Sequence, residues 1–212
     1  MSESAGELWL TAFQRLATRA AHEIRNPLNG VVVNVEVLRG RLSRAGSDPG
    51  RLATFAELAS GEIARSAELI EALLALARPP SGNLVDLREV LGPLVVLYRA
   101  VAARNGGSLE TVDPPKGPDA PSGRSAVLVD ALSARLAIAS ILDHSVEGPA
   151  RVTCWAAAVG GAPTVGVTRD GGGLTLQGLE RLLRAIPSVR IDQGPDTVRI
   201  VFPAPGAANH GA

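Results

Sequence analysis

The residues most able to do chemistry lie in the stretch RAAHEIRNPLNG, residues 19–30. Apolar residues recur around it at helical spacing, and His22 stands two positions before Ile24 of that apolar stripe. Because a helix turns by about 100° per residue, we expect His22 to point away from the stripe, into solvent. Pro27 has no amide hydrogen for the carbonyl of Glu23, so we also expect the helix to bend beside His22. A neutral imidazole is nucleophilic near physiological pH and could accept a transferred group, whereas the simpler interpretation is a surface histidine near a tolerated kink.

Two long apolar stripes must position this histidine. Steps of three and four residues mark each stripe as one face of a helix. A turn at residues 45–50 separates the stripes, and RPP at residues 78–80 ends the second one. One antiparallel hairpin cannot cover both faces, so we expect a homodimer whose hairpins form an intermolecular four-helix bundle. The first stripe is Trp9, Phe13, Leu16, Ala20, Ile24, Leu28, Val31, Val35, Leu38 and Leu42, and the second is Leu52, Ala56, Ala59, Ile63, Ala67, Ile70, Leu73 and Ala77.

Helices mixed with strands follow the hairpin, which predicts an α+β chain with a second, α/β-sandwich domain. We place the hairpin domain at residues 1–80, the sandwich at 81–203 and a disordered tail at 204–212. The expected elements are a helix from Asp86 to about Arg104, strands at 109–112 and 126–129, an apolar helix from Asp130 to near Val146, two β-hairpins, and a short helix at 176–186 between them.

The string HEIRNPLN, on the first predicted helix, resembles the H-box of bacterial sensor histidine kinases. In that family the histidine is phosphorylated on a dimeric helical hairpin. The resemblance implies that His22 is the phosphoacceptor. It also implies that Glu23 helps to orient the imidazole and draw off its proton. Asn26 matches the polar position that can align a water for dephosphorylation of a partner.

The region after the hairpin resembles the ATP-binding domain of these kinases in outline, but it departs from their chemistry. Ser140 and His144 stand where the family has asparagines for magnesium, and histidine is a poor ligand for that hard ion. In VTRDGGGL, Arg169 takes the place of the adenine-binding aspartate, although a slip of one residue would bring Asp170 there. The lid and the second glycine-rich segment are missing before the last helix. We therefore expect a degenerate domain without ATP binding, with no cofactor and no metal of its own.

These features resemble the dimeric, kinase-like histidine phosphotransferases of bacterial two-component phosphorelays. Such a protein passes a phosphoryl group between His22 and the aspartates of response-regulator receiver domains, one of which can belong to a hybrid histidine kinase. The receiver would supply the magnesium ion. Two alternatives stay open: a histidine kinase with an unorthodox nucleotide site, and a non-enzymatic pseudokinase scaffold. The intact HEIRN set argues against the scaffold, which has no need of it.

Composition limits the other classes of function. The chain has 212 residues, of which 46% are hydrophobic, and a formal net charge of zero, so nothing indicates a nucleic-acid partner. Cys154 is the only cysteine, which excludes an internal disulfide. Neither Cys154 nor His144 has the spacing of a metal site, so we expect both to be packing residues. Without a signal-peptide pattern or an apolar run of ~20 residues, we expect a cytoplasmic protein with no membrane partner.

Overall fold

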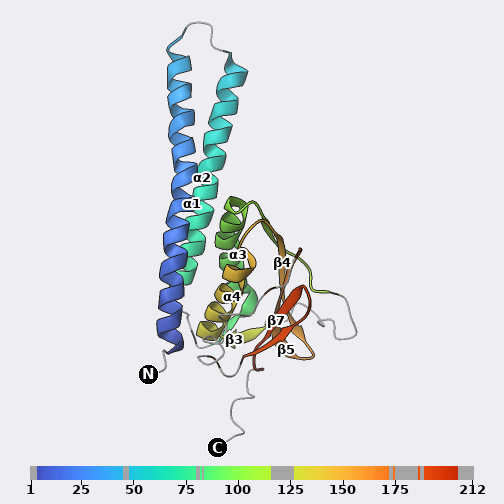
Figure 1. The fold of residues 1–212 in the computed structure, drawn as a ribbon. Coiled ribbons are helices and arrows are strands. Elements are labelled where there is room, and N and C mark those ends of the chain that lie inside the picture. Colours follow the sequence, from blue (N-terminus) through green and yellow to red (C-terminus); the bar gives the residue numbers. More distant parts are fainter. Residues whose placement is uncertain are drawn as a thin grey trace, which may run out of the picture.

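The N-terminal portion of the chain folds into the predicted helical hairpin (Figure 1). Helix α1 spans Ala5–Leu42 and begins with a capping box, in which the side chains of Ser4 and Glu7 each accept a hydrogen bond from the other residue's amide. Helix α2 spans Pro49–Ala77, begins after Asp48 as N-cap, and packs along α1. The computed structural model describes residues 4–44, 48–79, 82, 84–115, 127–171, 174, 186 and 189–204.

An α/β part follows, in which two helices cover one face of a mixed sheet. Its elements are β1 Leu84–Asp86, α3 Leu87–Arg104, β2 Ser108–Thr111, β3 Leu128–Asp130, α4 Ala131–Ser145, β4 Arg151–Val159, β5 Ala162–Arg169, β6 Arg190–Gln193 and β7 Thr197–Val201. The main sheet has the order β2-β4-β5-β7-β6, with β2 parallel to β4 and the other neighbours antiparallel, while β1 pairs antiparallel with β3. Helices α3 and α4 lie between the main sheet and the hairpin (Figure 1).

This architecture confirms the predicted α+β fold class and the order of the elements in the described residues. The short helix expected at 176–186 and the tail beyond Ala204 lie almost wholly outside the described residues. Among the helices that the structure describes, none combines the length and the apolar character that crossing a lipid bilayer requires.

A single hydrophobic core joins the hairpin to the α/β part. Leu16 of α1 and Leu69, Ala72 and Leu76 of α2 are buried in the same apolar cluster as the facing sides of α3, α4 and the sheet. Burying one leucine side chain is worth about 1.5–3 kcal/mol. The hairpin and the α/β part are therefore held together by apolar packing and do not meet at a polar, easily separated surface.

The predicted apolar stripes are only partly buried within one chain. Val35 of α1 is 50% exposed and Ile63 of α2 is 52% exposed, whereas Glu23 and Ser66, which belong to neither stripe, are buried. The reason is that the narrow contact between two helices covers only part of each broad stripe. An outer apolar band remains on the hairpin, formed by Leu28, Val32 and Val35 on α1 and Ile63, Ile70 and Leu74 on α2.

Trp155 and Gly166 are direct partners across the antiparallel pair of β4 and β5. Both residues are buried. A Cβ atom placed on Gly166 would come within 2.2 Å of the Trp155 indole. The ring therefore lies across the glycine and occupies the space that any side chain there would need.

We expect Gly166→Ala to lower the free energy of unfolding by about 1–3 kcal/mol, because the added methyl group displaces a packed ring. Gly40→Ala is the matched control, since a Cβ at this exposed position of α1 meets no other atom within 4 Å. Replacing this helical glycine with alanine should raise the free energy of unfolding by about 0.5–1 kcal/mol. Urea denaturation of both variants measures the difference, and an unchanged midpoint for Gly166→Ala would contradict this account.

Candidate functional site

His22 lies near the middle of α1 and is exposed, as its spacing from the apolar stripe predicts. Asn26, one turn further along, is exposed as well. Pro27 is buried, and α1 continues through it as one helix. The bend expected beside His22 stays a prediction. What the fold provides is an imidazole that a partner molecule can approach from solvent.

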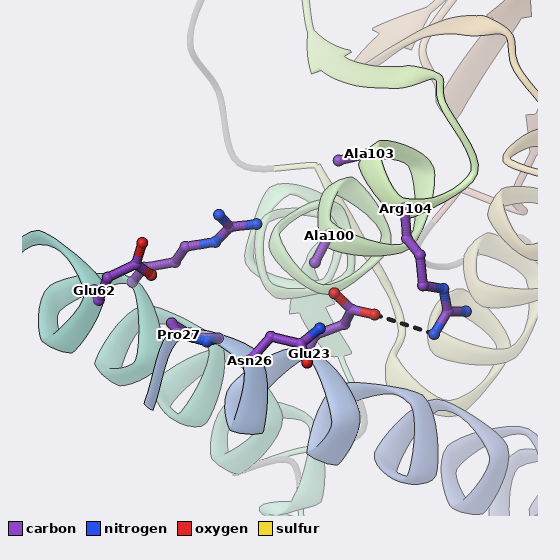
Figure 2. Close-up of a pocket in the computed structure, with 8 residues that line it drawn as sticks. Glu23, Asn26, Pro27, Glu62, Ala100, Ala103 and Arg104 are labelled. Atoms are coloured by element: carbon purple, nitrogen blue, oxygen red, sulfur yellow. Dashed lines mark hydrogen bonds and ion pairs between the residues drawn. The ribbon is translucent and has the colours of Figure 1, made fainter. Parts of the chain in front are cut away.

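Glu23, the residue after His22, is directed toward the α/β part (Figure 2). Its side chain is 7% exposed, and its Oε1 accepts a hydrogen bond of 3.1 Å from Nη1 of Arg104, the last residue of α3. Successive residues of a helix do not face each other, so this carboxylate extends from a different side of α1 than the imidazole. The expected role of Glu23, to orient the imidazole and take its proton, therefore stays a prediction.

Arg104 is a member of this site that the sequence did not reveal. It lies 81 residues from Glu23 along the chain, and its side chain is 46% exposed at the end of α3. A basic residue in the last turn of a helix is common, because it interacts favourably with the helix dipole. Nothing in the local sequence distinguishes Arg104 from such a residue.

An open cavity of about 390 Å³ lies between α1, α2 and α3 beside this ion pair (Figure 2). Two acidic and two basic side chains contribute to its wall, and the other lining residues are small or uncharged. Asn26 is among them, so the cavity begins on the turn of α1 that follows His22. The lining residues are Glu23, Asn26, Pro27, Glu62, Arg65, Ala100, Ala103 and Arg104.

A second ion pair, located a turn before Glu23, also joins α1 to the α/β part. Arg19 of α1 pairs with Asp143 of α4. Tyr98 of α3 is buried beside them, and burial followed by the negative charge of Asp143 raises the pKa of its phenol, which stays neutral. Arg19 and Glu23 share one face of α1, so two ion pairs hold this segment of the helix against the α/β part.

Two side chains that the sequence analysis placed in a degenerate nucleotide site contact backbone carbonyls of the chain itself. Nδ1 of His144 lies 2.9 Å from the carbonyl oxygen of Ser140, one turn back in α4. Nη2 of Arg169 donates a hydrogen bond of 2.5 Å to the carbonyl of Glu147. Asp170 is exposed in the turn after β5. The glycines that follow Gly171, and the segment where the lid is expected to be missing, lie outside the described residues.

Cys154 is buried in the core, as a packing residue should be. Its Sγ lies 3.7 Å from the carbonyl oxygen of Glu110, and burial raises the pKa of the thiol to about 11. Within the portion of the chain that the structure describes, no three His, Cys, Asp or Glu side chains gather as a metal site would require. Cys154 therefore contributes packing and stays a neutral thiol near pH 7.

Comparison with known families gives this geometry a context. Residues 14–82 match the His Kinase A (phospho-acceptor) domain. The match includes His22 and covers both helices from Gln14 onward. The hairpin resembles a histidine kinase phosphoacceptor domain. The matched segment is about a third of the chain, and the α/β part lies outside it.

Solved structures of histidine kinases are similar to the chain at low sequence identity. The Acinetobacter baumannii histidine kinase AdeS is 10% identical with a TM-score of 0.41, over 85% of this chain and 96% of that one. The histidine kinase ThkA, in complex with the response regulator protein TrrA, is 15% identical with a TM-score of 0.39, over 91% of this chain and 61% of that one. No curated protein sequence matches the chain.

Proposed function

We propose that this chain is a histidine phosphotransferase of a bacterial two-component phosphorelay, with His22 as the phosphoacceptor. The observation that carries the proposal is the exposed imidazole of His22 on a hairpin that matches the phosphoacceptor domain. The partners are response-regulator receiver domains, one of which can belong to a hybrid histidine kinase. Since these partners act in the cytoplasm, we place the protein there as well.

The chemical step is an in-line transfer between an aspartyl phosphate and the imidazole. A ring nitrogen of His22 attacks the phosphorus, the new N–P bond forms, and the P–O bond to aspartate breaks with its electron pair going to the aspartate carboxylate. The proton on the other ring nitrogen passes to Glu23, directly or through one water, or to solvent. The reverse reaction returns the group to a second receiver. The receiver supplies the magnesium ion, and Asn26 assists any hydrolysis of the partner's phosphate.

We propose that the phosphoryl group does not come from ATP bound by this chain. The contacts of His144 and Arg169 with backbone carbonyls support this, because both side chains are already engaged where a nucleotide's metal and adenine would need different groups. The shared core supports it as well. Leu16 of α1 is buried in the core that joins the hairpin to the α/β part, so a motion of the α/β part along its own α1 would expose it.

We further propose that the phosphoacceptor hairpin forms a four-helix bundle with a second copy of the chain. The outer apolar band runs along both helices and is left uncovered by the α/β part. Soluble monomers rarely expose contiguous apolar surface of this kind. An antiparallel hairpin with such a band is suited to self-association about a two-fold axis.

His22→Ala should abolish transfer from a phosphorylated receiver while the protein stays folded, because an exposed residue contributes within ~0.5 kcal/mol to stability. His144→Gln is the matched control and should retain transfer, since that ring contacts only its own helix in the described contacts. Acid-labile label is measured on the chain after incubation with each receiver of the organism. Absence of label on the wild-type protein across the full receiver set would sink the proposal in favour of a scaffold.

ATP with magnesium should give no binding signal in isothermal titration calorimetry at concentrations up to about 1 mM. The physical reason is that the sequence lacks the lid and the second glycine-rich segment that would supply backbone donors to a triphosphate. In the part of the chain that the structure describes, no three His, Cys, Asp or Glu side chains gather as a metal site would require. A parallel titration of the isolated ATP-binding domain of an active kinase shows that the assay detects binding. A micromolar dissociation constant for this chain would favour instead a kinase with an unorthodox nucleotide site.

Val35→Glu or Ile63→Glu should convert a dimer into monomers or insoluble protein, because each places a charge within the outer apolar band. Val33→Glu is the control, since Val33 is exposed on α1 but lies two positions from Val35, on the opposite side of the helix. Multi-angle light scattering at micromolar concentration measures the mass of each. A monomeric wild-type protein, or equal effects of all three substitutions, would refute the proposed interface.

A further inference from the structure

Arg104 is held in place by the turn that follows it. Asn105 caps α3 and its Nδ2 donates a hydrogen bond of 2.8 Å to the carbonyl of Val146, after the end of α4. The amide of Gly107 bonds to the carbonyl of Ala102. A Cβ on Gly107 would come within 2.3 Å of the Ala150 carbonyl oxygen, so the chain passes closely against the start of β4. The end of α3, and with it the base of the Arg104 side chain, is thereby fixed relative to α4 and the sheet.

Arg104 provides the hydrogen bond that the Glu23 carboxylate receives among the described contacts. Glu23 is buried, and its hydrogen bond with Arg104 engages Oε1. From the residues that the structure describes, Oε2 receives no hydrogen bond. A buried carboxylate that loses its hydrogen-bonded cationic partner turns out toward solvent, because an unpaired buried charge is strongly unfavourable.

We propose that Arg104 is a positioning residue for phosphotransfer at His22, acting through Glu23. This inference rests on the proposed function. By binding Oε1, the guanidinium holds the Glu23 carboxylate along the wall of the cavity and leaves Oε2 to accept a proton. A nucleophile, a base and a third group that orients the base is a recurring arrangement in covalent catalysis. Here the third group comes from the α/β part, which thereby serves the chemistry of the hairpin without binding a nucleotide.

The proton balance of the transfer defines what Glu23 does. When one imidazole nitrogen forms its bond to phosphorus, the ring gains positive charge, and the proton on its other nitrogen becomes acidic. That proton moves to Oε2 of Glu23 through bridging water, because the two side chains extend from different sides of α1, as the leaving group departs with its electron pair. A displaced Glu23 carboxylate cannot take it. The geometry of Arg104 therefore affects the rate of the chemical step and leaves the binding of the donor unchanged.

The Arg19–Asp143 ion pair provides a control that separates a role in the reaction from simple attachment of α1 to the α/β part. Asp143 pairs with Arg19 on the same face of α1, joins α1 to the same α/β part, and makes no described contact with Glu23. Asp143→Asn therefore weakens the attachment of α1 while Glu23 and Arg104 stay paired. If Arg104 only held the hairpin against the α/β part, Asp143→Asn and Arg104→Gln would have the same effect on the reaction.

The test uses potassium phosphoramidate, a small phosphoryl donor that requires no protein docking, with phosphorylated His22 measured on a phosphate-affinity gel. We expect Arg104→Gln to lower the maximal rate by about 10-fold with KM within about 2-fold, a fraction of the ~10²- to 10⁴-fold typical of general-base help. Arg104→Lys should recover most of the rate. Asp143→Asn should stay within about 2-fold of wild type. In a Glu23→Gln background, Arg104→Gln should cause no further loss.

Several results would overturn the inference. They are a wild-type rate for Arg104→Gln, a loss for Asp143→Asn equal to that for Arg104→Gln, or an additive loss in the Glu23→Gln background. Thermal melts of each variant show whether it is folded, and Arg104→Lys keeps the test decisive if Arg104→Gln is not. Labelling of His22 by phosphoramidate without transfer from any receiver would refute the proposed function alone. No labelling of wild-type His22 would refute both.

Discussion

The rest of this structure depends on one apolar contact, which joins the N-terminal half of α1 and the C-terminal half of α2 to helices α3 and α4. Leu16 on α1 and Leu69 and Leu76 on α2 are buried in the same core as the sheet's covering helices. Because that contact is apolar and continuous, it brings side chains from the hairpin and the α/β part close enough to form ion pairs. The pairs Arg19–Asp143 and Glu23–Arg104 follow from this packing, since neither could form without it. Helix α1 is thus attached on one side and exposed to solvent on the other.

The surface of α1 therefore has three sides with different surroundings. One side contacts α2 and the α/β part, the side of Val35 carries some of the outer apolar band, and the side of His22 and Asn26 is polar and exposed. A helix has room for three such sides only when each is narrow, which is why the burial within one chain is limited to a thin line of residues. The same limit leaves the apolar band uncovered within one chain and keeps the imidazole of His22 exposed.

Much of this could be predicted from the sequence, because the relevant signals are local. Periodicity predicted both long helices, and the capping residues Asp86 and Asp130 predicted the starts of α3 and α4. The exposure of His22 followed from its spacing alone. What could not be predicted depends on residues brought together by the fold. Arg104 gives no local sign that it meets Glu23, and a glycine in a strand does not reveal that a tryptophan lies across it, as Trp155 does in β4.

The order of charges along α1 has a consequence for where the helix can sit. Arg19 and Glu23 are opposite in sign and one turn apart, and they face an acidic group on α4 and a basic group on α3. Sliding α1 by one turn, about 5.4 Å, would bring two like charges together at one of these positions in either direction. The apolar contact by itself would tolerate such a shift far better, because it is not directional. The four charges therefore favour a single register of α1 against the α/β part. That register fixes the position of His22 along the hairpin relative to the α/β part, and hence how far any docking partner must reach.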